Sequence, residues 1–153
     1  MNEKFNILVK RMPERLKEIK NKPLLAKDEL WGIPQKGVYV FYENNKALYV
    51  GRSNNLKLRI QQHGRKSSTH NQAQLAFNIA NKVMEQGTKI PRYITRKQKE
   101  KAPGFDRAFF EARRRVSQMK VRVVGIEDQI EQALFEIYAH LALNTRYNDF
   151  STH

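Results

Sequence analysis

The sequence contains no cysteine among its 153 residues. A disulfide framework, a cysteine-ligated zinc site and a thiol nucleophile are therefore excluded. No apolar run approaches the roughly 20 residues that are needed to span a bilayer, so a membrane protein is excluded as well. Residues 1–21 are charged throughout and have no apolar signal-peptide core, so we expect a cytoplasmic location.

The composition that is present is typical of a folded domain. Hydrophobic residues make up 40% of the chain and aromatic residues 10%, which argues against a wholly disordered protein. A chain of this length can bury a hydrophobic core of its own. We therefore expect one domain over residues 1–153.

Positive charge is the most unusual property of the sequence. It contains 29 Lys and Arg against 15 Asp and Glu, a net charge of +14. Residues 64–120 alone carry +10, whereas residues 121–153 carry −3. An uneven excess of this kind indicates a polyanionic partner, and nucleic acid is the first hypothesis. Anionic lipid is the weaker alternative, because no basic helix has the bulky apolar face that interfacial insertion needs. An acidic protein partner is a third interpretation.

The residue pattern predicts a small sheet with helices around it. Strands are expected at 37–43 and 46–51, which form a hairpin, and at 121–126. Helices are expected in a short segment from residue 55 and at 72–86, 106–119 and 128–143, with a further helix near the N-terminus that Pro13 breaks or restarts. Residues 88–105 have no apolar periodicity and are predicted as a basic loop. The fold class is α/β: a mainly antiparallel three-stranded sheet flanked by helices, with a helical N-terminal extension (1–36) and a basic, mostly helical insertion (64–120).

Two short motifs frame the predicted hairpin. Gly37-Val38-Tyr39 and Tyr49-Val50-Gly51 have nine residues between them. They are followed by Arg52, Arg59 and His63, and much later by Glu136 and Asn148. This ordered set resembles the GIY-YIG nuclease family, both the nuclease module of excision-repair enzymes and the restriction endonucleases of that family.

The resemblance implies a metal-dependent endonuclease that hydrolyses phosphodiester bonds, most simply in DNA. Its catalytic residues would be Tyr39, Tyr49, Arg59, His63, Glu136 and Asn148. Glu136 would hold Mg²⁺ or Mn²⁺ together with water and a substrate phosphate. Tyr39 would act as general base or proton relay with help from His63, and Arg59 would neutralise charge on the phosphoryl group. Because an unperturbed phenol is a weak base at pH 7, Arg52, Arg59 or the metal would have to lower its pKa.

Each of these residues also has an ordinary structural interpretation. The tyrosines are good strand formers that fill cores, and Arg59 is one of 29 basic residues. His63 is equally well explained as a surface histidine, and Asn148 as a residue of a turn. Glu131 lies about 140° around the helix from Glu136, so we expect it to be solvated rather than a second metal ligand. The alternative function is a nucleic-acid-binding protein that keeps this scaffold without turnover.

The two tyrosines can share a site only if they lie on the same face of the hairpin. That condition predicts Tyr39 directly opposite Tyr49, which requires an odd-numbered loop such as three residues centred on Asn44. A two-residue turn at Asn44 and Asn45 would place the rings on opposite faces.

The remaining basic residues are expected to bind the nucleic-acid backbone. The candidates are Arg52, Lys97, Lys99, Arg113, Arg114 and Arg115, together with the rest of the loop 88–105. Cleavage of both strands with one active site per chain favours a homodimer. The sequence does not distinguish DNA from RNA.

Overall fold

The computed structural model describes residues 1–87 and 95–151. The chain divides into two compact units, which we describe one at a time. The first comprises residues 1–60 and 119–146, and the second residues 61–118 and the C-terminal segment from residue 147. The helix α2 (Leu56–Gly64) begins in the first unit and ends in the second. Within the described residues no helix has both the length and the apolar character to cross a membrane.

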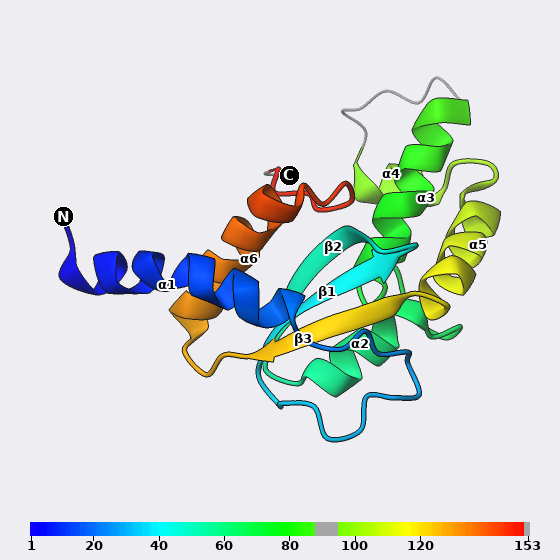
Figure 1. The fold of residues 1–153 in the computed structure, drawn as a ribbon. Coiled ribbons are helices and arrows are strands. Elements are labelled where there is room, and N and C mark those ends of the chain that lie inside the picture. The colour runs from blue at the N-terminus through cyan, green and yellow to red at the C-terminus, as the bar shows by residue number, and fades with distance from the viewer. Residues whose placement is uncertain (88–94, 152–153) are drawn as a thin grey trace. The chain divides into compact units, whose positions relative to one another are not determined.

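The first unit is built on the predicted three-stranded sheet. Its strands are β1 (Gly37–Glu43), β2 (Lys46–Ser53) and β3 (Lys120–Gly125). They are antiparallel in the order β2-β1-β3, so β1 is central and β2 is an edge strand (Figure 1). Helices flank this sheet, which confirms the expected α/β fold class.

The hairpin between β1 and β2 differs from the prediction in its turn. Asn44 and Asn45 form a two-residue turn with positive φ values of 51° and 63°, a conformation that asparagine tolerates well. Glu43 pairs with Lys46, but the register then shifts, and Phe41 pairs with Tyr49 because Leu48 is an extra residue in β2. This β-bulge moves Tyr49 to the face that carries Tyr39, although the turn has an even number of residues. The predicted pairing of Tyr39 with Tyr49 is therefore wrong, and their predicted common face is correct.

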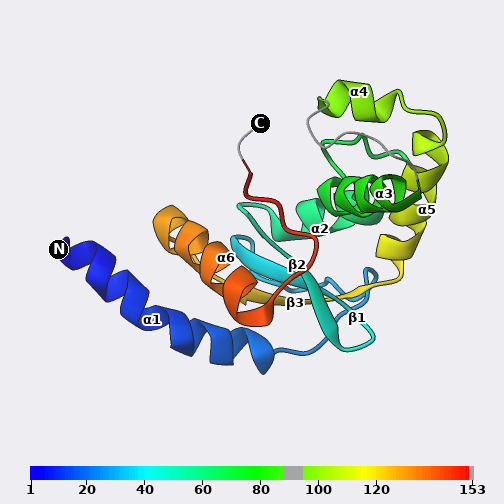
Figure 2. The same ribbon diagram turned by 90° about the horizontal axis from the view of Figure 1, so that it is seen from above.

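Two helices cover the other face of the sheet. Helix α1 (Glu3–Lys20) and helix α6 (Gln129–Leu143) lie side by side along the sheet (Figure 2). Side chains such as Ile19 and Phe135 pack against Val38, Val40 and Val124. Even-numbered residues of β1 thus face this core, as the period of two in a strand requires. The core holds α6 in place on the sheet.

Helix α1 is continuous, and the predicted break at Pro13 is wrong. A proline removes one N–H and leaves the carbonyl four residues earlier without its helical partner. That carbonyl belongs to Val9, which is 41% exposed, so water can reach this turn of the helix. Burial of Met12 and Ile19 on the core face then stabilises the helix on both sides of the proline.

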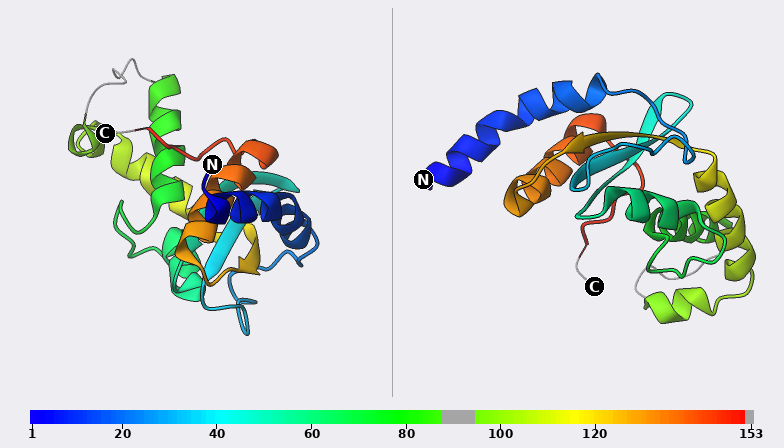
Figure 3. Two further views of the ribbon diagram at one scale, coloured as in Figure 1. Left: turned by 90° about the vertical axis from the view of Figure 1, so that its left-hand side faces the viewer. Right: turned by 90° about the horizontal axis from the view of Figure 1, so that it is seen from below.

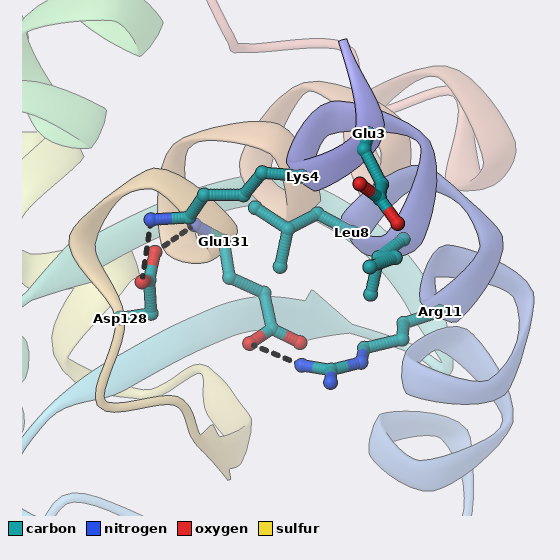
Figure 4. Close-up of a pocket in the computed structure, with 7 residues that line it drawn as sticks. Glu3, Lys4, Leu8, Arg11, Asp128 and Glu131 are labelled. Atoms are coloured by element: carbon teal, nitrogen blue, oxygen red, sulfur yellow. Dashed lines mark hydrogen bonds and ion pairs between the residues drawn. The ribbon is translucent and has the colours of Figure 1, made fainter.

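Glu131 is buried, so the prediction of a solvated side chain is wrong. Its carboxylate accepts a hydrogen bond from Arg15 Nε at 3.0 Å and lies 3.7 Å from Arg11 Nη1. Figure 4 shows Arg11 of α1 pointing at Glu131 of α6 across a pocket, with a second ion pair between Lys4 and Asp128. These ion pairs attach the N-terminal helix to the first turns of α6.

The second unit contains α3 (Gln74–Gly87), α4 (Arg96–Glu100) and α5 (Phe105–Ser117), which Figure 3 shows from two further sides. Its core includes a cluster of rings in which Phe105 stacks on Phe109 at 6.2 Å and His70 lies edge-on to Phe109 at 4.4 Å. The predicted loop 88–105 is only partly observable, because residues 88–94 lie outside the described residues. The remainder is not a simple loop: Thr95 caps α4 with a capping box, and the fully buried Phe105 begins α5.

Candidate active site

The candidate site lies at the edge of the sheet, where Tyr39 crosses the edge strand. Tyr39 belongs to the central strand and pairs with Gly51 of β2. A Cβ atom at position 51 would collide with the Cζ and hydroxyl oxygen of Tyr39, so the ring lies directly over Gly51. Glycine at this position therefore lets the hydroxyl of a central-strand residue reach the sheet edge.

The two tyrosines and Phe41 form one aromatic group. The ring of Tyr39 lies 5.8 Å from that of Phe41, edge to face, and 6.4 Å from that of Tyr49. Tyr39 is 1% exposed and Tyr49 is 9% exposed. Burial raises the pKa of Tyr49 to about 12 and raises the pKa of Tyr39 well above 10. Both phenols are thus protonated at neutral pH.

Arg59 is positioned against these hydroxyls by the first turns of α2. The side chain of Asn55 accepts a hydrogen bond from the backbone N–H of Leu58 at 3.3 Å, which caps the start of the helix. Leu56 and Ile60 are buried, and the half-buried Arg59 hydrogen-bonds to Tyr39. Its positive charge lowers the pKa of both tyrosines, but burial has the larger effect on each of them.

Glu136 supplies the carboxylate of the site from α6. Its side chain is 23% exposed, and its Oε2 lies 3.7 Å from Arg52 Nε at the end of β2. Burial raises the pKa of Glu136 above its ordinary value, and Arg52 partly opposes this increase. Glu136 also raises the pKa of Tyr39 and of Tyr49. Arg52 thus acts on Glu136, and its predicted contact with the phosphate, or its effect on a tyrosine, stays a prediction.

The donor set fits a hard divalent cation that keeps most of its water. Among residues 1–87 and 95–151 no group of three or more His, Cys, Asp or Glu could hold a metal ion. Mg²⁺ is usually bound through one or two carboxylates together with water and substrate phosphates. A partly desolvated Glu136 meets this requirement, because a cation beside it would offset the cost of burying its charge.

His63 belongs to the second unit and is completely buried there. It is 0% exposed, and its Nδ1 accepts a hydrogen bond from the backbone N–H of Leu75 at 3.4 Å. The interpretation as a surface histidine is therefore excluded. The part of His63 in proton transfer stays a prediction.

Asn148 also belongs to the second unit and follows an anchored tyrosine. The backbone carbonyl of Tyr147 accepts a hydrogen bond from Asn78 Nδ2 at 2.8 Å. The buried ring of Tyr147 lies 5.1 Å from Lys82 Nζ and 6.0 Å from the guanidinium of Arg115. These contacts fix the backbone that carries the half-buried Asn148.

The predicted backbone-binding residues differ in their surroundings. Arg113 is half-buried: its Nη1 donates to the carbonyls of Lys66 and Ser68, the latter at 2.9 Å, and its guanidinium lies 4.6 Å from the ring of Phe109. Arg114, Arg115 and Lys97 are exposed, and Lys99 is half-buried. Arg113 thus holds the loop between α2 and α3, Arg115 lies near the ring of Tyr147, and Arg114 is exposed.

Four features in and around the site were missed by the sequence analysis. The bulge at Leu48 and the role of Gly51 as a crossing point have no signature in a single sequence. Gln129 donates to Asn54 Oδ1 at 2.7 Å and ties the turn after β2 to α6. His140 follows Glu136 by four residues, and its Nδ1 lies 2.7 Å from Thr145 Oγ1. The helical spacing of Glu136 and His140 was the one available signal.

The class of the domain follows from a comparison with known families, which indicates a nuclease-type fold. The family model for the GIY-YIG catalytic domain matches residues 35–148. The chain belongs to the GIY-YIG family, whose nucleases act on nucleic acid and generally depend on a divalent metal. Searches of curated proteins and of solved structures gave no significant match.

Proposed function

We propose that the protein is a divalent-metal-dependent endonuclease that hydrolyses phosphodiester bonds in DNA. The observation that supports the proposal is that the ring of Tyr39 lies 6.4 Å from that of Tyr49 and that Arg59 and Glu136 act electrostatically on both rings. A permanent cation, a carboxylate and two buried hydroxyls suit an anionic substrate that gains charge in the transition state. Family membership supports the same reaction class.

The chain's own groups would have separate tasks in this reaction. A divalent cation, when bound at Glu136, would supply charge neutralisation and a more acidic water. Arg59 would hold the phosphate and offset its developing charge, because a guanidinium binds two phosphate oxygens at once. Tyr39 and Tyr49, whose raised pKa values keep them protonated, would donate hydrogen bonds that orient the phosphate and the attacking water.

Arg52 sets the pH at which the site gains its negative charge. Since Arg52 lowers the pKa of Glu136, Arg52→Gln should raise that pKa further. The acid limb of the pH–rate profile should therefore move to higher pH, with a larger loss of activity at pH 6 than at pH 8. Lys46→Gln removes the same charge from the exposed start of β2 and should leave the limb in place. If the acid limb of the pH–rate profile were the same in both variants, Arg52 would not control the ionisation of Glu136.

The second unit would bind the DNA backbone through its exposed cations. Arg114→Ala and Lys97→Ala should each weaken binding and reduce the slope of log K against log salt by about 1. Lys10→Ala, an exposed charge on α1, is the matched control and should leave the slope unchanged. Filter-binding at a series of salt concentrations measures both quantities. If the slope of log K against log salt were the same for all three variants, the DNA would bind to a surface that does not include Arg114 and Lys97.

The activity itself is tested with supercoiled plasmid. We expect nicking or linearisation with Mg²⁺ or Mn²⁺, none with EDTA, and less turnover of an RNA of equal length. DNA that is retarded on a gel but stays intact with each metal would favour the alternative, a binding protein that keeps the scaffold without turnover. Binding to an acidic protein with no dependence on phosphate would reject both interpretations.

A further inference from the structure

The segment between α2 and α3 of the second unit begins with a basic turn. The backbone N–H of Ser68 donates to the carbonyl of Arg65 at 3.0 Å, which closes a turn of four residues. Arg65, Lys66 and Ser67 are exposed, and within residues 1–87 and 95–151 neither cation forms an ion pair. We call residues 65–68 the basic turn. Its two adjacent cations are available to an anionic partner.

The basic turn is anchored on both sides. Before it, Gly64 lies so close to α5 that a Cβ atom at this position would be 2.8 Å from the Cα of Ser117. At its end, Ser68 is buried, and its hydroxyl donates to the carbonyl of Gln62 at 2.6 Å. The chain that enters the turn and the chain that leaves it are thus held against the rest of the second unit.

Two arginines hold the carbonyl groups of this segment from inside. Arg113 Nη1 donates to the carbonyls of Lys66 and Ser68, the latter at 2.9 Å. Arg96 Nη2 donates to the carbonyl of His70 at 2.6 Å. Surface turns are commonly mobile, and water can satisfy their carbonyls. Two guanidinium groups in this place therefore indicate a turn whose conformation is fixed before any partner binds.

The surroundings of Arg113 suit a support of the turn better than a contact with DNA. Its guanidinium lies 4.6 Å from the ring of Phe109, and its Nε is buried. Its Nη1 already donates to two carbonyls, which a phosphate would have to replace. The cations that face solvent at this place are those of Arg65 and Lys66.

We propose that Arg65, Lys66 and Ser67 bind a phosphate of the DNA backbone, and that Arg113 is a positioning residue for this turn. The identity of the polyanion rests on the proposed function, but the inference requires binding only and not cleavage. Two cations and a hydroxyl on consecutive residues match the charge and the acceptor oxygens of a phosphodiester. A turn that is fixed in advance loses little conformational entropy on association. Residues 65–69 contain no apolar side chain, so a membrane surface is not favoured.

The salt dependence of DNA binding tests the two cations. Arg65→Ala and Lys66→Ala should each reduce the slope of log K against log salt by about 1, measured by anisotropy of a labelled duplex in EDTA. Both side chains are exposed, so neither substitution should unfold the protein. The double variant Lys10→Ala/Lys27→Ala removes two exposed cations of the first unit and should leave the slope unchanged. A wild-type slope in both Arg65→Ala and Lys66→Ala would overturn the proposal.

Arg113→Lys separates positioning from direct contact, because it keeps the positive charge. Lysine is shorter and lacks the planar group that lies against Phe109, so it should not hold the two carbonyls in the same way. We expect Arg113→Lys to weaken binding about fivefold, as much as Arg113→Ala does. It should have no further effect in the Arg65→Ala/Lys66→Ala background. Wild-type affinity in Arg113→Lys, or an undiminished effect in that background, would overturn the positioning role.

Tryptic cleavage after Arg65 and Lys66, followed by mass spectrometry, reports on the turn without DNA. Arg113→Lys should be cut faster at these two bonds than the wild type, because its turn opens more often. Bound duplex should slow the same cuts in the wild type, and unchanged cutting in both comparisons would overturn the proposal. Since binding is measured in EDTA, a protein that binds through the turn without cleaving DNA would refute only the nuclease. Normal cleavage with unchanged salt slopes would refute only this inference.

Discussion

Glu136→Gln should abolish DNA cleavage and leave the fold at least as stable as before. Loss of the carboxylate removes the anionic ligand of the site, and a loss of about 10³-fold or more corresponds to roughly 4 kcal/mol of transition-state stabilisation. The folded-state pKa of Glu136 is raised, so its protonated form is the one that favours folding. That stability is present at low pH and is lost as pH rises through the folded pKa, and a neutral amide retains it at pH 7. Plasmid cleavage and thermal unfolding measure the two effects, and gel retardation should show unchanged or tighter binding.

Glu131→Gln on the same helix is the matched control and should show the opposite pattern. Glu131 is buried against Arg11 and Arg15, so removal of its charge breaks both ion pairs, although Arg15 keeps its bond to Glu18. A loss of stability of about 2–4 kcal/mol is expected, with cleavage per folded molecule nearly unchanged. If Glu131→Gln removed activity at full stability and Glu136→Gln did not, the site would have been assigned to the wrong carboxylate.

Gly51→Ala should damage both the stability and the activity of the protein. The added methyl group would occupy the place of the Tyr39 ring, so the ring or the edge strand must move. Overpacking of this kind costs about 1–3 kcal/mol, and displacement of a reacting group by about 1 Å can reduce the rate about 10²-fold. Chemical unfolding and a cleavage assay at saturating metal measure these losses.

A double-mutant cycle tests whether the collision with Tyr39 causes the loss of stability in Gly51→Ala. A leucine at position 39 has no atoms where the phenol Cζ and hydroxyl lie, so Gly51→Ala should be nearly neutral for stability in the Tyr39→Leu background. The coupling energy between the two positions should then equal most of the cost of Gly51→Ala alone. Additive effects would show that the methyl group disturbs β2 in some other way.

Much of the fold follows from local patterns in the sequence. The β-branched and aromatic residues of 37–43 and 46–51 predicted the hairpin, and Asp128, which caps α6, marked the start of the helix that carries Glu136. The order of the two tyrosine motifs, Arg59 and Glu136 was sufficient to indicate the family. The hairpin and the start of α6 depend on residues that are close in sequence. The family motif depends on residues whose order and spacing are fixed by the fold.

The errors came from contacts between distant parts of the chain. Pro13 remains inside α1 because residues on both sides of it pack on the sheet, which propensity alone does not reveal. Glu131 is buried because α1 brings two arginines to it.

The bulge at Leu48 has a consequence for the distance between the two tyrosine motifs. A hairpin keeps both rings on one side only when the count of intervening residues has the right parity, and one unpaired residue in either strand reverses that parity. Deleting Leu48 alone would remove the bulge and leave Tyr49 opposite Phe41, whereas deleting one turn residue with the bulge kept would turn Tyr49 toward the helices. Loop lengths in hairpins of this design can therefore change in steps of two, or in steps of one when a bulge is gained or lost.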